Sequence, residues 1–81
     1  MNISELVLFL VKSVVKDKES ISISKIETDD EDIIEVIVSE DDMKRVIGKN
    51  GLVINSIRTI ASSAVYANNL KKVKINVDYL K

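Results

Sequence analysis

Hydrophobic residues recur at helical spacing near the start of the chain. Asn2 and Glu5 are spaced as in a capping box, and an apolar face follows them. The members of this face, Ile3, Leu6, Val7, Leu10 and Val14, repeat at intervals of three or four residues. The pattern predicts an amphipathic helix over residues 3–16.

The next two segments have the patterns of β-strands. Apolar and polar residues alternate from Ile21 to Ser24, which predicts a strand over 21–28 with one buried face. The acidic run 29–32 predicts a turn. The almost continuously apolar segment 33–38 predicts a central strand packed on both faces, joined to the first strand as an antiparallel hairpin.

Two helices and a last strand are expected in the second half of the chain. Ser39 is a good N-cap for a short helix that ends near residue 47, and acidic residues occupy its first turn. A longer helix is expected over 52–67, and strict alternation predicts a strand over 73–79. The apolar stripe of the longer helix is expected to contain Val53, Ile57, Ile60, Ala61 and Ala64.

The order of these elements defines an α+β fold, α-β-β-α-α-β. A crossover connection through helices usually returns a parallel strand, whereas the hairpin is antiparallel. We therefore expect a mixed three-stranded sheet with 33–38 in the middle and the helices packed on one face. A chain of 81 residues has room for one domain of this kind, residues 1–81.

The composition argues against catalysis. The chain is 46% hydrophobic and contains no Cys, His, Pro or Trp, which removes thiol and imidazole chemistry, disulfides and the commonest zinc sites. The acidic residues cluster in a turn and a helix cap, where solvation and capping explain them. We expect no enzymatic activity, no metal or other cofactor and no small-molecule substrate.

The formal net charge of −1 conceals an asymmetric charge distribution. Residues 1–42 carry 12 acidic residues and 4 lysines, a net charge of −8, whereas residues 43–81 carry 8 basic residues and a single acidic one, a net charge of +7. Ordinary solvated surface explains any single one of these charges. A local excess of positive charge nevertheless attracts polyanions.

No segment has the length or composition of a membrane anchor. The longest apolar run, 6–11, is far below the roughly 20 residues that a membrane-spanning helix needs. It follows Glu5 rather than a basic segment, and no small-residue cleavage site follows it. We expect a soluble cytoplasmic domain that does not bind membranes.

The only two glycines of the chain stand three positions apart, at Gly48 and Gly51. A tight turn between two helices explains this spacing by itself. A turn without side chains also lets a polyanion reach main-chain N–H groups at the positive end of the next helix. Four basic residues lie within ten positions of the turn, namely Lys44, Arg45, Lys49 and Arg58.

The segment 46–57, with the sequence VIGKNGLVINSI, resembles the core pattern V-I-G-x-x-G-x-x-I-x-x-I of a KH domain. Together with the element order, it resembles the type II KH fold over nearly the whole chain. A single domain of this size is similar to the KhpA family of small bacterial RNA-binding proteins. The acidic first half and the neutral Asn50 depart from the pattern.

The resemblance implies that single-stranded RNA crosses the turn, with its phosphates on residues 48–51 and its bases in an apolar groove. By position, Lys49 and Asn50 would meet the sugar-phosphate backbone. Val46, Ile47, Ile54 and Ile57 would line or support the groove. Core packing explains Val46, Ile47 and Ile57 equally well, whereas Ile54 lies one step off the main stripe and is the better groove candidate.

The few aromatic residues predict weak binding. Phe9, Tyr66 and Tyr79 are all distant from the glycines in sequence, so no aromatic side chain is expected near the turn for base stacking. We therefore expect low intrinsic affinity and low sequence specificity, with a modest dependence on salt.

The outward face of helix 52–67 is unusually poor in charge. It carries Asn55, Thr59, Ser62, Ser63 and Tyr66, with Arg58 as its only charged residue. Interfaces are depleted in charge and favour Tyr, although an ordinary Ser/Thr surface is an equally good explanation. The resemblance implies a homodimer, or a complex with a larger KH-containing partner of the KhpB (Jag) type.

Three classes of function remain. A non-catalytic RNA-binding module, acting as an RNA chaperone or post-transcriptional regulator, is the first, and the resemblance links it to control of the cell envelope and cell length. The second is a protein-interaction adaptor whose KH turn is structural or binds RNA only within a heterodimer. The third, a DNA-binding helix-turn-helix, is poorly supported because helix 52–67 offers only one Arg to base edges.

Overall fold

The computed structural model describes residues 2–80 and contains three α-helices, two short 3-10 helices and three strands. In chain order they are α1 (Ile3–Lys12), η1 (Lys18–Ser20), β1 (Ser22–Glu27), β2 (Asp32–Val38), α2 (Glu40–Ile47), η2 (Lys49–Gly51), α3 (Leu52–Ala67) and β3 (Val73–Tyr79). The predicted order of helices and strands is confirmed. No helix within residues 2–80 combines the length and the apolar character needed to cross a membrane.

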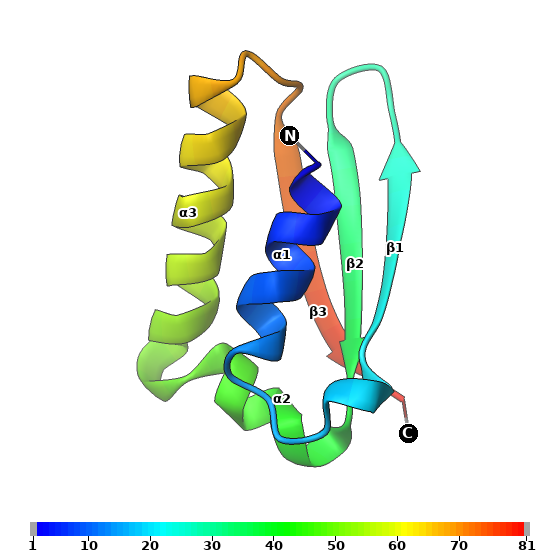
Figure 1. The fold of residues 1–81 in the computed structure, drawn as a ribbon, viewed down its shortest axis with the longest axis vertical. Coiled ribbons are helices and arrows are strands. Elements are labelled where there is room, and N and C mark those ends of the chain that lie inside the picture. The colour runs from blue at the N-terminus through cyan, green and yellow to red at the C-terminus, as the bar shows by residue number, and fades with distance from the viewer. Residues whose placement is uncertain (1, 81) are drawn as a thin grey trace.

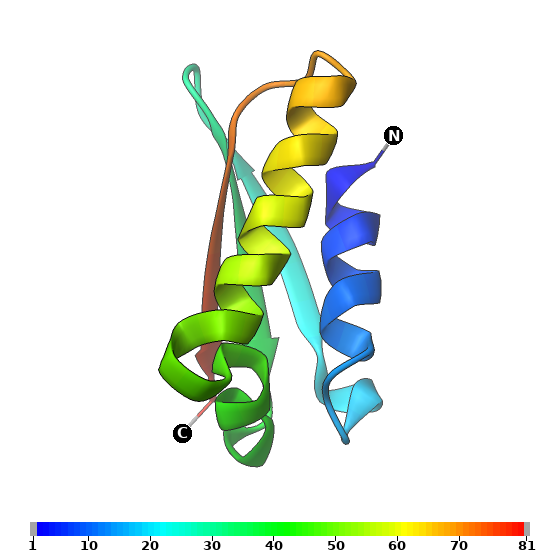
Figure 2. The ribbon, with the colours of Figure 1, turned by 90° about the vertical axis from the view of Figure 1, so that its left-hand side faces the viewer.

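The sheet has the predicted topology. The strand order is β1-β2-β3, with β1 antiparallel to β2 and β3 parallel to β2. Ile34 pairs with Ile75 and Val36 with Val77, so the buried residues Ile34, Val36 and Ile75 share one face with the half-buried Val77. All three α-helices lie on that face, and the opposite face of the sheet is open (Figure 2).

The open face corrects one expectation about β2. Its central position in the sheet was predicted, but its side chains are packed by helices on one face only. Ile34, Val36 and Val38 are buried, whereas Ile33 and Ile37 belong to the open face and are half-buried. The continuous apolar run of β2 therefore reflects its place between two strands rather than a layer on each side.

The first helix ends earlier than its apolar spacing predicts. α1 stops at Lys12, and the hydroxyl of Ser13 donates to the carbonyl oxygens of Phe9 and Leu10. The chain then turns so that the N–H groups of Lys16 and Asp17 reach the carboxylate of Asp42 on α2. Val15 still enters the core, which is why periodicity alone extends the helix too far.

The helix α3 packs against both α1 and β3 (Figure 1). Ile54, Ile57, Ala61 and Val65 form its buried stripe. Ile60, which was expected in that stripe, is 45% exposed. The stripe is rotated relative to the prediction because the helix must cover the sheet and α1 at once, so Ile60 is turned outward.

Candidate nucleic-acid interface

The glycine turn, residues 48–51, joins α2 to α3 at the lower end of the molecule (Figure 1). Three of its residues have positive φ angles, namely Gly48 at 76°, Asn50 at 56° and Gly51 at 76°. The N–H of Gly48 donates to Lys44 O at 2.9 Å, and that of Gly51 donates to Gly48 O at 3.2 Å. Within residues 2–80, no backbone hydrogen bond uses the N–H of Lys49 or Asn50, and both residues are exposed.

Steric contact explains why the first residue of the turn is a glycine. A β-carbon at position 48 would lie 2.5 Å from Val53 Cγ2 and 2.9 Å from the backbone nitrogen of Val53. At Gly51 the nearest atom to such a β-carbon is 3.5 Å away, so only the positive φ angle favours glycine there. The turn thus folds closely onto the first turn of α3.

The four basic residues near the turn do not form a single patch. Lys44 and Lys49 are exposed, and neither takes part in an ion pair within residues 2–80. The guanidinium of Arg45 instead lies 3.1 Å from the carboxylate of Asp42 and also donates to Asp41 O. Two exposed cations without an ion-pair partner in residues 2–80, Lys44 and Lys49, therefore lie in or near the turn, whereas Arg45 is paired with Asp42.

Asp42 is the buried polar residue that fixes α2. Its side chain is 1% exposed and accepts hydrogen bonds from the N–H groups of Lys16 and Asp17, both at 2.9 Å. These two bonds, helped by Ser39 and Arg45, lower the pKa of Asp42 from 3.8 to about 2, although burial acts in the opposite direction. The carboxylate ties the end of the α1 connection to the helix that carries the turn.

Arg58 lies two turns further along α3 and points to the edge of the sheet. Its Nε and Nη2 atoms donate to the carbonyl oxygen of Ile75 at 3.3 and 3.1 Å. β3 is an edge strand, so this carbonyl belongs to the unpaired side of the strand. Arg58 therefore belongs to the α3–β3 boundary, about 10 Å along the helix from Gly51 at the usual rise per residue.

A hollow of about 440 Å³, here called the edge hollow, lies along this boundary. Sequence reasoning missed its strand side, because Lys72 and Lys74 were treated only as the polar phase of an alternating strand. The sequence did contain a signal for this side of the hollow, because the two lysines alternate with Val73 and Ile75 along the last strand. The residues that line the edge hollow are Glu31, Arg58, Ser62, Lys72, Val73, Lys74, Ile75 and Asn76.

The apolar groove candidates fall into two groups. Val46, Ile54 and Ile57 are buried in the hydrophobic core, and Ile54 is only 4% exposed. The expectation that Ile54 faces a groove rather than the core is therefore wrong, because the buried stripe of α3 includes it. Only Ile47 is half-buried and lines a surface hollow.

The structure also corrects the expectation that no aromatic residue lies near the turn. Tyr79, at the end of β3, lines a hollow of about 520 Å³ together with Ile47 and Gly48. The parallel pairing of Tyr79 with Val38, just before α2, places this distant residue beside the helix that leads into the turn. We call this space the Tyr79 hollow.

The polar face of α3 is exposed as predicted. Thr59, Ser62, Ser63 and Tyr66 line one hollow of about 460 Å³ with Arg58. Asn55 is exposed on the same helix, where its side-chain oxygen accepts a hydrogen bond from Arg58. The ring of Tyr66 is 90% exposed, at the end of the helix far from the glycine turn.

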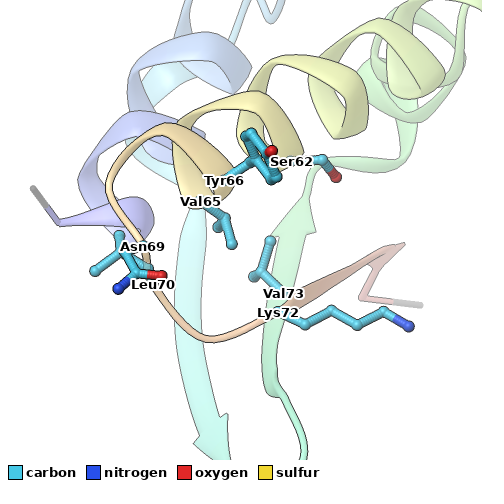
Figure 3. A pocket seen from close by; sticks show the side chains of 7 residues that line it. All are labelled: Ser62, Val65, Tyr66, Asn69, Leu70, Lys72 and Val73. Atoms are coloured by element: carbon cyan, nitrogen blue, oxygen red, sulfur yellow. The ribbon is translucent and has the colours of Figure 1, made fainter.

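Tyr66 also borders a hollow at the C-terminal end of α3, with a volume of about 590 Å³. Figure 3 shows Val65 and Val73 pointing toward one another between α3 and the start of β3. Ser62 and Tyr66 lie above them on the helix, and Asn69 and Leu70 close the far side. The polar face of α3 therefore continues into a partly apolar depression.

The fold and the turn define the class of this protein. An α-β-β-α-α-β order, a mixed sheet with helices on one face and a Gly-x-x-Gly turn between two helices are the features of a type II KH domain. Residues 4–77 match the family described as KhpA/KhpB, KH domain, and the chain belongs to this family. The family is not enzymatic, in agreement with the composition.

Bacterial relatives match most of the chain. It is 40% identical over 73 residues to the RNA-binding protein KhpA of Listeria monocytogenes, a match that covers 90% of this chain and 95% of the relative. The RNA-binding protein KhpA of Clostridium perfringens is 36% identical over 73 residues, and this match covers 90% of this chain and 96% of the relative. KhpA of Borreliella burgdorferi is 30% identical, with coverages of 90% and 88%.

Solved structures share the fold at low identity. Aquifex aeolicus Era bound to GDP.AlF4- superposes with a TM-score of 0.71 and 20% identity, over 96% of this chain and 30% of that chain. Era in complex with MgGDPNP and nucleotides 1506-1542 of 16S ribosomal RNA gives a TM-score of 0.67 at 20% identity, over 95% and 29%. This chain thus corresponds to less than a third of Era.

Proposed function

We propose that this protein is a single KH domain that binds single-stranded RNA across the glycine turn and along the edge hollow. The observation that carries the proposal is the turn itself. Its tip presents the N–H groups of Lys49 and Asn50, which have no backbone hydrogen-bond partner among residues 2–80, near the cations of Lys44 and Lys49. The relatives named RNA-binding protein KhpA support the same function.

The phosphates of the RNA would lie on the turn. Gly48 and Gly51 have no side chains to hold a phosphate away from the main chain, and the N-terminus of the 16-residue helix α3 adds its positive end. Lys49 and Asn50 would flank the sugar-phosphate backbone, with Lys44 on the adjacent helix. Arg45 would contribute by fixing α2 through Asp42 rather than by meeting the RNA.

The strand would then continue from the turn along the α3–β3 boundary. Arg58, Lys72 and Lys74 supply positive charge there, partly offset by Glu31. The unpaired edge of β3 offers main-chain donors and acceptors to unstacked bases. Val46, Ile54 and Ile57 would support the binding surface from the core, while Ile47 lines the separate hollow beside Gly48.

The test is a binding measurement with a loop variant. In fluorescence anisotropy with a labelled single-stranded RNA, Lys49→Asp/Asn50→Asp should bind at least tenfold more weakly than the wild type, because like charge would face each phosphate on the turn. The control Lys12→Glu/Ser22→Asp makes the same change in net charge on α1 and β1 and should bind like the wild type. Equal binding by the loop variant and the wild type would overturn the proposal.

The proposed cellular role is that of an RNA chaperone or post-transcriptional regulator in the cytoplasm, connected with the cell envelope and cell length. Crosslinking in cells followed by sequencing of the bound RNA tests it, with the loop variant as the control. Recovery of the same RNA with both proteins would instead favour an adaptor whose turn is structural.

The proposal includes pairing through α3, either as a homodimer or with a KH-containing partner of the KhpB (Jag) type. The exposed side chains of Asn55, Thr59, Ser62 and Ser63 form the polar part of the surface. Ile60 and Tyr66 add two exposed large apolar side chains on the same helix, as expected of interface residues. Pairing would bring two weak RNA sites together and raise avidity.

A further inference from the structure

The Tyr79 hollow lies under α2, on the side of the helix where β3 ends. Its volume of about 520 Å³ is within the range of about 300–1,000 Å³ that is common for small-molecule sites. Tyr79 and Gly48 are two of its lining residues, so the space is continuous with the glycine turn. The remaining lining residues are Glu40, Asp41, Met43, Lys44 and Ile47.

The sheet register explains why Tyr79 is there. Its side chain follows the apolar phase of β3, with Val73, Ile75 and Val77, and so lies on the face that carries the helices. Its partner Val38 immediately precedes Ser39, the N-cap of α2, which holds the end of β3 beneath that helix. The ring is half-buried, and its hydroxyl makes no hydrogen bond within residues 2–80.

The charges of the hollow are unsuited to a phosphate group. Glu40 and Asp41 contribute two negative charges against the single positive charge of Lys44. Met43 and Ile47 contribute apolar walls and Tyr79 contributes an aromatic ring, a combination that favours an aromatic ligand. Carboxylates accept hydrogen bonds from the exocyclic amino group of cytosine. These features together describe a site for a nucleobase whose phosphate lies outside.

We propose that the Tyr79 hollow binds one base of the RNA strand whose phosphates lie on the glycine turn. The base stacks on the ring of Tyr79, and its exocyclic amino group donates to Glu40 or Asp41, so that cytosine is preferred to uracil. This inference rests on the proposed function. It adds an aromatic contact and a base preference, whereas the sequence alone predicted no aromatic residue near the turn and low sequence specificity.

The experiment compares two labelled RNA decamers, oligo-C and oligo-U, by fluorescence anisotropy. Tyr79→Leu should bind oligo-C at least about fivefold more weakly than the wild type, because stacking on an aromatic side chain is lost. Tyr79→Phe keeps the ring and should bind within twofold of the wild type. Phe9→Leu removes an exposed aromatic residue of α1 and should leave binding unchanged.

A separate variant, with both carboxylates removed, tests the preference for cytosine over uracil. The wild type should bind oligo-C more tightly than oligo-U, and Glu40→Ala/Asp41→Ala should bring the ratio of the two dissociation constants close to one. The ratio is the informative quantity, because loss of two negative charges strengthens binding of both RNAs. A ratio that is the same in the variant and the wild type would overturn the proposed role of the carboxylates.

The loop variant separates failure of this inference from failure of the proposed function. If Lys49→Asp/Asn50→Asp loses binding while Tyr79→Leu binds like the wild type, the Tyr79 site is wrong and RNA binding at the turn stands. If the loop variant binds like the wild type, the proposed function itself is wrong. If Tyr79→Leu changes only the sedimentation behaviour, the hollow contacts protein and the inference is wrong.

A measurement that leaves Tyr79 intact covers the case in which Tyr79→Leu does not fold. The chain has two tyrosines, so in Tyr66→Phe the only tyrosine emission comes from Tyr79. Stacking of a base on the ring should quench this emission as oligo-C saturates the protein. Unchanged emission at saturation, with binding established by anisotropy, would rule out the site.

Discussion

Gly48 lies so close to Val53 that a β-carbon at position 48 would be 2.5 Å from Val53 Cγ2 and 2.9 Å from its backbone nitrogen. The contact joins the first residue of the glycine turn to the first turn of α3. Because one of the two clashes is with backbone, a side-chain rotation cannot relieve it. The geometry of the glycine turn is therefore set by packing within the protein, before any ligand is present.

The two glycines should respond differently to alanine. Gly48→Ala meets both the clash and the positive φ angle, and should lower the free energy of unfolding by about 3 kcal/mol or more. Gly51→Ala meets only the φ angle and should cost about 1–2 kcal/mol. Urea unfolding measures both, and equal losses for the two variants would contradict the steric argument.

Removal of the Asp42 carboxylate should change how stability depends on pH. The pKa of Asp42 is lowered from 3.8 to about 2 in the folded protein, mainly by the N–H groups of Lys16 and Asp17. The folded state therefore favours the ionised form, and this contribution is present above about pH 4 and lost as the pH falls toward 2. Asp42→Asn should be less stable than the wild type at pH 6, with a difference that narrows toward pH 2.

Urea unfolding at a series of pH values measures this difference. Asp41→Asn is the matched control, since it removes a neighbouring exposed carboxylate whose side chain makes no hydrogen bond or ion pair within residues 2–80. The control should follow the wild-type curve. A constant gap between Asp42→Asn and the wild type from pH 6 to pH 2.5 would argue against the assignment.

The salt dependence of RNA binding should show whether RNA phosphates contact the cations of the edge hollow. For single strands, log K falls with log[salt] by about 0.7 per phosphate neutralised. Lys74→Ala removes one cation of the edge hollow and should reduce the slope by about 0.7, with little change in the unfolding midpoint. The control Lys12→Ala, on α1, should leave the slope unchanged. If Lys74→Ala has the same slope as the wild type, RNA does not follow the α3–β3 boundary.

The exposed face of α3 should control association of the protein. Tyr66 is 90% exposed, so Tyr66→Asp should leave the fold stable while placing a charge within the proposed contact. In sedimentation at high micromolar concentration, the wild type should form dimers and the variant should be monomeric. Leu80→Asp changes another exposed apolar residue and should still dimerise. Wild-type monomers under these conditions would remove the homodimer from the proposal.

Local patterns predicted most of the fold because they report on local forces. The alternation of 73–79 and the apolar spacing of 52–67 reproduced β3 and α3 within the accuracy of such boundaries. The end of α1 was wrong, since the helix stops at Lys12 so that Lys16 and Asp17 can bond to Asp42, 26 and 25 residues away. A hydrogen bond across that separation leaves no periodic signal.

For the candidate site, too, the sequence predicted some features and not others. The two glycines and the basic residues around them were identified by spacing, because a turn between helices is made from consecutive residues. Spacing did not identify the role of each candidate residue. In the structure Arg45 is bound to Asp42, Arg58 is bound to Ile75, and Ile54 is in the core. Each of these outcomes depends on which element packs beside the residue.

The sequence by itself determined the element order, the mixed sheet and the turn at residues 48–51, because hydrophobic periodicity and the restricted use of glycine are properties of neighbouring residues. Only the tertiary structure decided which side chains share a surface. Parallel pairing of β3 with β2 lets Tyr79 line one hollow with Gly48, and lets Lys72 and Lys74 line another with Arg58. These contacts arise from the packing of strands and helices that are distant in sequence, and that packing sets the surface available to RNA.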